Sequence, residues 1–229
     1  ILNEILEADY DRMMERTSNR PLAAKRWSPS SALVIAGIFS LFGIILLALL
    51  NPLTSFLGTL SLVTYAFLYT PLKRYSPVSV IVGAIPGALP VLIGMIAHDG
   101  VVTTGALFLF AIQFIWQFPH FWSIGFLSYD QYKHAGYKLL PEDDGQIDRR
   151  LGTQTLVYTC LLIPVIAIGF IMQLISIWGA IGLVLVSSYF IWRAWVFYRR
   201  FDKASARALM FSSFIFLPLA LLVLWWGIQ

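Results

Sequence analysis

Charged side chains are scarce in this sequence. Only 12% of the 229 residues are Asp, Glu, Lys or Arg, whereas 59% are hydrophobic and the mean hydropathy is +0.76. An average soluble domain has about 25% charged residues. The composition therefore excludes an ordinary soluble domain and predicts that lipid is the solvent of most of the chain.

Cysteine is nearly absent, and the first residues lack the pattern of a secretory signal. Cys160 is the only cysteine, so neither an internal disulfide nor a cysteine-based metal site is possible; we expect it to be inert packing. A signal peptide has a basic segment, an apolar segment and a small-residue cleavage site, whereas this chain begins at Ile1 with a charged helical pattern. We therefore expect the domain to be truncated at its N-terminus.

Apolar runs long enough to cross a membrane recur along the chain. A bilayer core of about 30 Å needs roughly 20 apolar residues per helix. The runs predict an all-α fold, a polytopic transmembrane helix bundle that forms a single membrane-embedded domain over residues 1–229. The seven expected spans cover residues 31–51, 53–70, 77–97, 104–128, 153–173, 175–198 and 208–228.

Lys and Arg are missing from every second connection between these spans. All sixteen lie in residues 1–30, in the connections 71–76 and 129–152, and from Arg193 to Arg207. Because cytoplasmic loops carry an excess of Lys and Arg, we expect these segments in the cytoplasm, or in the matrix of a mitochondrion. All acidic residues except Asp99 share this face, which is therefore zwitterionic and gives little support for nucleic-acid binding.

Three oxygen-bearing residues near the start repeat every four positions. Asn3, Glu7 and Asp11 share one face of a helix at this spacing, where two carboxylates repel unless positive charge lies between them. Mg²⁺ prefers oxygen ligands and often joins one or two carboxylates to substrate phosphates. The stripe therefore predicts a magnesium and diphosphate site; the alternative is an exposed, salt-bridged helix beside the membrane.

Arginines continue the four-residue spacing. Arg16 and Arg20 follow the carboxylates, and Pro21 predicts that the helix ends at or before Arg20. The planar guanidinium fork suits phosphate oxygens. Carboxylates and arginines on one stripe indicate a metal-and-phosphate site.

One histidine is expected deep inside an apolar span. His120 follows Pro119 in the span 104–128, where a polar residue is costly and marks a candidate functional site. The alternative is a core histidine that is hydrogen-bonded to a neighbouring helix.

Several motifs resemble the signatures of the UbiA-type membrane prenyltransferases and, within that family, those of the heme O synthase branch. The first is the stripe itself, from Asn3 to Arg20-Pro21-Leu22. The segments that separate this branch from quinone-type relatives are Trp116-Gln117-Phe118-Pro119-His120-Phe121 and Tyr132 through Ala135-Gly136 to Pro141. Two more are Tyr69-Thr70-Pro71-Leu72-Lys73-Arg74 and Gly83 to Pro90; together the motifs cover residues 3–141.

The resemblance implies an activity and a location. It implies nine helices in the full protein and Mg²⁺-dependent transfer of a farnesyl group from farnesyl diphosphate to a vinyl group of heme b (protoheme IX), giving heme O for cytochrome oxidase. It places the protein in the bacterial inner membrane, or in the mitochondrial inner membrane, with its active site on the cytoplasmic or matrix face. Beside the lipid bilayer, the partners that it implies are heme A synthase or oxidase assembly proteins.

The resemblance also implies site residues. Asn3, Glu7 and Asp11 would hold Mg²⁺, with Asp130 as a further ligand or, in its place, Asp143 and Asp144 in the loop. Here the sequence departs from the family, which has an acidic residue at the position of Gln131, so the carboxylate is rotated by about 100° on a helix. The implied donors to the diphosphate are Arg12, Arg16, Arg20, Lys73 and Arg74, and the other substrate-binding residues are Tyr69, Trp116, His120 and Tyr132, with His120 expected to bind heme, through its iron.

Two other functions stay open at this point. A prenyltransferase that acts on an aromatic quinone precursor would use the same metal and diphosphate site. A membrane transporter would also contain an intramembrane histidine and helices broken by Gly and Pro. Transport needs access from both faces, whereas beyond His98 and Asp99 the face opposite the basic segments has almost nothing that ionises.

Overall fold

The computed structural model describes residues 1–227, and the contacts within it divide the chain into two compact units. Unit 1 consists of residues 1–102 and 128–139, and unit 2 of residues 103–127 and the chain from 140 onward. The single domain over residues 1–229 stays a prediction.

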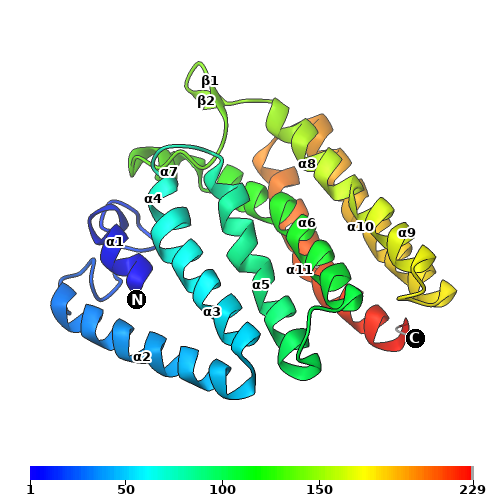
Figure 1. Cartoon of the computed structure of the whole chain (residues 1–229). Helices are drawn as coiled ribbons and strands as arrows, with labels where there is room; N and C mark the ends of the chain where they lie inside the picture. The colour runs from blue at the N-terminus through cyan, green and yellow to red at the C-terminus, as the bar shows by residue number, and fades with distance from the viewer. Residues whose placement is uncertain (228–229) are drawn as a thin grey trace. The chain divides into compact units, whose positions relative to one another are not determined.

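Unit 1 is an all-helical unit in which α1 packs against α2 and α4, and α3 packs between α2 and α5. Figure 1 shows α1, at the blue end of the chain, beside α4. Its elements are α1 (Leu2–Asp11), α2 (Pro29–Leu50), α3 (Pro52–Val63), the π-helix η1 (Thr64–Tyr69), α4 (Thr70–Leu72), α5 (Ser79–Asp99) and α7 (Tyr129–His134).

Proline and a capping side chain define two helix starts in unit 1. Ser28 and Asn51 accept hydrogen bonds from the backbone N–H groups at the starts of α2 and α3, and a proline follows each of them. Both choices suit a helix N-terminus, because a cap satisfies a free N–H and proline has none to satisfy. The sharp Asn51-Pro52 junction turns the chain back, so that α2 and α3 pack together.

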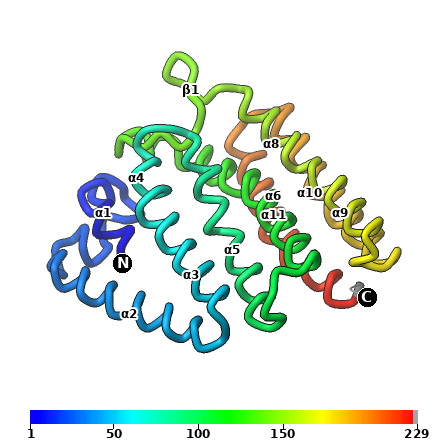
Figure 2. The backbone as a smooth tube through the Cα atoms, viewed as in Figure 1, coloured from blue at the N-terminus to red at the C-terminus, as the bar shows by residue number. Residues whose placement is uncertain are grey.

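Unit 2 is built around α6, α10 and α11, with α8 and α9 packed against α6 and α10. Its elements are α6 (Thr104–Leu127), β1 (Glu142–Asp143), β2 (Gln146–Ile147), α8 (Arg150–Cys160), α9 (Leu162–Ile171), α10 (Ile177–Arg200) and α11 (Lys203–Gly227). The strands form an antiparallel hairpin in which Glu142 faces Ile147, visible as a loop in the tube of Figure 2. The core of unit 2 contains three fully buried phenylalanines, Phe190, Phe197 and Phe216.

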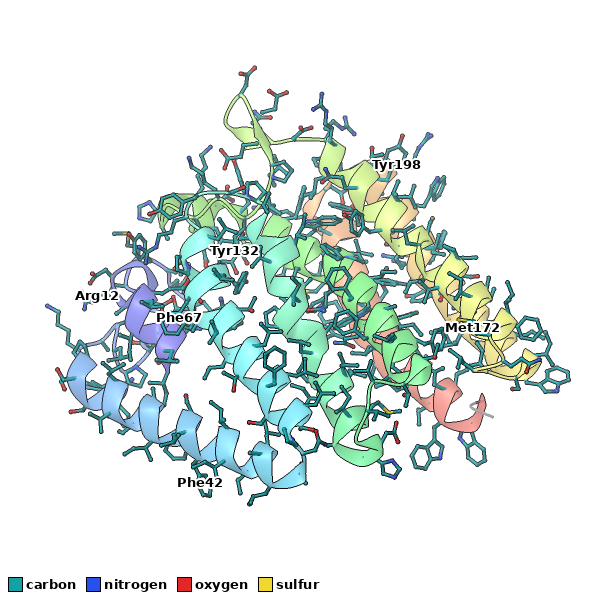
Figure 3. The ribbon with its side chains drawn as sticks, viewed as in Figure 1. Arg12, Phe42, Phe67, Tyr132, Met172 and Tyr198 are labelled. Carbon is teal, nitrogen blue, oxygen red and sulfur yellow. The ribbon has the colours of Figure 1, made fainter. Side chains whose placement is uncertain are left out.

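Seven helices of the described chain are long and apolar enough to cross a membrane. They cover residues 29–50, 52–72, 79–99, 104–127, 150–171, 177–200 and 203–226, and they confirm the predicted spans within a few residues. The last span starts five residues earlier than predicted, because Lys203 and Arg207 lie on its helix; its predicted end at 228 lies outside the described residues. Outward-pointing side chains such as Phe42 on α2, which is 57% exposed, form the face expected against lipid (Figure 3).

Candidate active site

A polar cavity of about 170 Å³ lies within unit 1. Most of its lining is polar, and it joins α1, the turns after it, the η1–α4 junction, and α7 with the segment that follows it. The lining residues are Asn3, Glu7, Asp11, Met14, Arg16, Thr17, Arg20, Tyr65, Tyr69, Lys73, Tyr132, Tyr137 and Leu139. The structure thus brings together eight residues that the sequence predicted as site residues, which are Asn3, Glu7, Asp11, Arg16, Arg20, Tyr69, Lys73 and Tyr132.

Both carboxylates of the stripe are buried and each has its own cation. Glu7 and Asp11 are 3% and 1% exposed. Lys73 Nζ lies 2.5 Å from Glu7 Oε1, and Arg20 Nη1 donates to Asp11 Oδ2 at 2.9 Å. These cations relieve the carboxylate repulsion that the spacing predicted, so the cavity is lined by two acid–base pairs that an incoming anion and cation can separate.

α1 ends well before Arg20, so Arg16 and Arg20 do not continue its helical stripe as their spacing suggested. α1 ends at Asp11, whose carbonyl accepts a hydrogen bond from the Thr17 hydroxyl at 2.9 Å. The chain then folds back in turns, and this reversal lets Arg20 reach Asp11 nine residues away. In a continuous helix the two residues would be about 14 Å apart along the axis, so the pair depends on the early helix end.

Two cations of the cavity differ in how firmly they hold their protons. Burial lowers the pKa of Lys73 below its ordinary value, although the Glu7 carboxylate acts in the opposite direction. Burial acts the same way on Arg20, but its hydrogen bond and charge interaction with Asp11 raise its pKa overall. The two pKa values are therefore shifted in opposite directions, and Arg20 is the firmer cation of the cavity.

A π-helix precedes the second motif and shapes one wall of the cavity. In η1 the helix widens over Thr64–Tyr69, and π-helical turns are often found at functional sites. The Thr70 hydroxyl lies 2.9 Å from the Tyr65 carbonyl and 2.9 Å from Asn3 Oδ1. Thr70, which the sequence did not single out by itself, thereby fixes the Asn3 amide against the wider turn.

Tyr137 is a cavity residue that sequence reasoning missed. Gly136 ends α7 with a φ of +79°, a conformation that glycine adopts without a steric penalty. The Tyr137 N–H then bonds the Tyr132 carbonyl, and Lys138 N–H bonds the Lys73 carbonyl at 2.7 Å. This turn places the Tyr137 ring in the cavity, so the Ala135-Gly136 pair of the motif was the signal that could have revealed it.

The Tyr137 hydroxyl is buried next to a carboxylate. Burial and the nearby Glu7 charge raise the pKa of Tyr137, which stays a phenol at neutral pH. Its oxygen is buried without a well-oriented hydrogen bond to any described residue. A buried hydroxyl of this kind is a ready donor for an anionic ligand, because leaving it unpaired costs free energy.

Five predicted residues lie outside the lining, three of them in unit 1. Arg74 donates to the Leu6 carbonyl at 2.7 Å and stacks over the Tyr10 ring, so it ties α4 to α1. Arg12 (Figure 3) donates to the Ala23 carbonyl and pairs with Asp9. Asp130 is exposed on α7. The roles of these residues toward a substrate or metal stay predictions.

An apolar cavity of about 370 Å³ adjoins the polar one. It lies between α1, α2 and α3, and it shares Asn3 and Tyr65 with the polar cavity. Its other lining residues are mostly apolar: Ile1, Leu2, Ala36, Phe39, Ser40, Leu62 and Ala66. Unit 1 thus offers a charged compartment next to one suited to a hydrocarbon chain.

Trp116 and His120 belong to unit 2, where they stack with ring centroids 4.8 Å apart. Trp116 Nε1 donates to the Ser213 carbonyl at 2.9 Å, and His120 Nδ1 lies 2.8 Å from the Ser213 hydroxyl. The alternative of a histidine that is hydrogen-bonded to a neighbouring helix is therefore correct for one ring nitrogen. Trp116 and His120 thus form a cluster on α6 that is not part of the lining of the polar cavity.

The described residues include no group of three or more His, Cys, Asp or Glu that could hold a metal ion. A site built only from protein carboxylates is not what Mg²⁺ requires, because Mg²⁺ is usually bound by one or two carboxylates plus waters and phosphates. Glu7, Asp11 and the Asn3 amide form such a donor set on one cavity wall. The residues present therefore fit a magnesium ion that binds together with a diphosphate.

Together, the fold and this site define a multi-pass integral membrane protein with a charged cavity beside an apolar one. A model of the UbiA prenyltransferase family matches residues 1–226. The chain belongs to the UbiA prenyltransferase family.

Two relatives of this chain are both named protoheme IX farnesyltransferase. The protoheme IX farnesyltransferase of Christiangramia forsetii is 38% identical over 226 residues, which cover 96% of this chain and 74% of the relative. That of Flavobacterium johnsoniae is 39% identical over 227 residues, with 96% and 74% covered. Among solved structures, a digeranylgeranylglyceryl phosphate synthase matches with a TM-score of 0.81 at 18% identity over 99% of this chain and 78% of its own. A UbiA homolog from Aeropyrum pernix K1 has a TM-score of 0.64 at 19% identity, with 96% and 83% covered; at such identities these two structures support the fold alone.

Proposed function

We propose that this protein transfers the farnesyl group of farnesyl diphosphate to a vinyl group of heme b, with addition of water, and so forms heme O. The observation that carries the proposal is the polar cavity of unit 1, in which two buried acid–base pairs adjoin an apolar compartment. The names of the relatives support heme b as the acceptor. The basic segments that line the cavity support a place on the cytoplasmic or matrix face of a bacterial or mitochondrial inner membrane.

The cavity residues have roles that suit the departure of diphosphate. Asn3, Glu7 and Asp11 would hold Mg²⁺, which supplies positive charge that makes the diphosphate a better leaving group. Arg16, Arg20 and Lys73 donate to the diphosphate oxygens as the allylic C–O bond breaks. Lys73 and Arg20 exchange their carboxylate partners for phosphate oxygens in this step, which keeps every buried charge paired.

The apolar compartment of unit 1 would hold the hydrocarbon chain of the prenyl donor. The apolar cavity beside Asn3 and Tyr65 receives the farnesyl chain, which leaves the diphosphate among the cations. His120 would bind heme b through its iron, as the motif implies. Breaking the allylic C–O bond releases diphosphate, the farnesyl carbon bonds to one carbon of the heme vinyl group, and water adds to the other vinyl carbon with loss of one proton.

One assay tests the proposed reaction directly. Membranes that contain the protein are incubated with heme b, farnesyl diphosphate and Mg²⁺, and the hemes are extracted and analysed by mass. We expect a product that is heavier than heme b by a farnesyl group and a hydroxyl group. Formation of a prenylated aromatic quinone precursor in a parallel incubation, without heme O, would instead support the quinone-type reaction.

The buried tyrosine gives a prediction about diphosphate binding. Tyr137→Phe removes only the hydroxyl, and hydrogen bonds to charged groups contribute about 1.5–3 kcal/mol. We therefore expect the KM for farnesyl diphosphate to rise roughly 10-fold or more with a smaller change in kcat. Tyr75→Phe is the matched control, because Tyr75 is 73% exposed. An unchanged KM in Tyr137→Phe would remove this residue from the diphosphate site.

Two glycines of α5 give a prediction about cavity shape. A Cβ on Gly83 would lie 2.7 Å from the Tyr69 ring, whereas a Cβ on Gly94 meets nothing within 4 Å. Gly83→Ala must therefore displace a ring that lines the cavity, and we expect about a 10-fold loss of heme O formation, since overpacking of this kind costs about 1–3 kcal/mol. Gly94→Ala should leave activity intact and stabilise the helix slightly. Equal rates for the two variants would show that the Tyr69 ring position is not critical.

A further inference from the structure

Ser213 of α11 contacts both members of the stacked pair on α6. Its carbonyl accepts the Trp116 indole N–H at 2.9 Å, and its hydroxyl lies 2.8 Å from His120 Nδ1. Ser213 is fully buried and His120 is 9% exposed. One residue of α11 thus holds two residues that occupy successive turns of α6.

The Ser213 hydroxyl already donates its proton to a backbone carbonyl. Ser213 Oγ lies 2.5 Å from the Met210 carbonyl oxygen. Two oxygens approach this closely only when a hydrogen lies between them, and a carbonyl has none, so the serine donates. A serine hydroxyl carries a single proton, and its oxygen is therefore an acceptor toward His120.

The proton between Ser213 and His120 must then come from the imidazole. A neutral histidine carries its proton on one ring nitrogen and a lone pair on the other. Because Nδ1 donates to Ser213 Oγ, the lone pair lies on Nε2, which has no hydrogen bond to any described residue. A lone pair on a ring nitrogen is what a metal ion requires of histidine.

We infer that Ser213 is a positioning residue that fixes His120 as the Nδ1–H tautomer and so leaves the Nε2 lone pair available to the iron of heme b. The inference rests on the proposed function for the heme, whereas the tautomer is a property of the protein alone. The Trp116 stack and the edge-on contact with Phe214, at 5.1 Å, fix the plane of the ring, and Ser213 fixes its proton. Such outer partners of a metal-bound histidine typically change metal affinity by about 10–100-fold.

Nitrogen NMR of the full chain without heme tests the tautomer. The chain has only three histidines, His98, His120 and His134, so ¹⁵N-histidine labelling gives three imidazole patterns, and His120→Ala identifies one of them. We expect Nδ1 of His120 to carry the proton in the wild type and in Ser213→Thr, and a tautomer mixture or Nε2–H in Ser213→Ala. An Nε2–H pattern in the wild type, or no change in Ser213→Ala, would overturn the inference.

Heme titration followed by absorption tests the consequence. Ser213→Ala should weaken heme b binding about 10-fold and shift the heme absorption, with recovery in Ser213→Thr. Ser212→Ala is the matched control, because Ser212 is also buried and donates to a carbonyl three residues earlier, that of Leu209, at 2.7 Å. Wild-type affinity in Ser213→Ala would overturn the role of Ser213. A spectrum unchanged by His120→Ala would instead reject the proposed heme ligand, and the NMR result would stand apart from it.

Discussion

Glu7→Gln and Asp11→Asn are each expected to reduce heme O formation by about 10²–10³-fold, the loss typical when one group that stabilises developing charge is removed. Both substitutions keep the shape of the side chain and remove its charge. Each carboxylate is buried in the polar cavity and paired with a cation that we assign to the diphosphate. Without the carboxylate, the cavity loses a ligand for Mg²⁺ and the group that holds Lys73 or Arg20 in place.

The metal role can be separated from a loss of folding. We expect both variants to require more Mg²⁺ than the wild type for half-maximal rate, measured by mass analysis of the extracted hemes. Asp9→Asn is the control on the same helix, since Asp9 is exposed and pairs with Arg12 outside the cavity lining. If Asp11→Asn, or the more severe Asp11→Ala, formed heme O at the wild-type rate, the proposed magnesium site would be wrong.

The spans could be predicted from the sequence because the signal is local. Each run of about 20 apolar residues has only one stable form in lipid, where every backbone polar group needs an internal partner. Irregular features depend on contacts between distant segments and were not predictable in this way. The surroundings of the widened turn η1 are one of them, because Thr70 at its end bonds Asn3, which is 67 residues away.

The candidate site was predictable where helical spacing alone brings residues together. Asn3, Glu7 and Asp11 line one cavity because residues four positions apart lie on the same face of α1. The four-residue spacing did not predict the ion pair of Arg20 with Asp11, because Arg20 reaches Asp11 through a reversal of the chain after α1. It also could not show that Ser213 meets His120, because these residues are 93 positions apart.

The pairing of Lys73 with Glu7 leads to a prediction about stability that is independent of any substrate. The two side chains are 11% and 3% exposed, so removing one leaves a charge buried without a partner. Breaking a buried pair in this way typically costs about 3–5 kcal/mol. We therefore expect Lys73→Met to lower the free energy of unfolding in detergent micelles by that order.

A double-mutant cycle separates the pair from general damage to the cavity. Glu7→Gln combined with Lys73→Met removes both charges, and we expect it to recover most of the stability that Lys73→Met loses, since paired removal of buried charges is often close to neutral. Asp9→Asn, which breaks an exposed pair, should leave the unfolding midpoint unchanged. Additive losses in the double variant would show that Lys73 and Glu7 do not stabilise each other. Recovery of stability without recovery of heme O formation would show that these charges are retained in the cavity for the reaction and not for the fold.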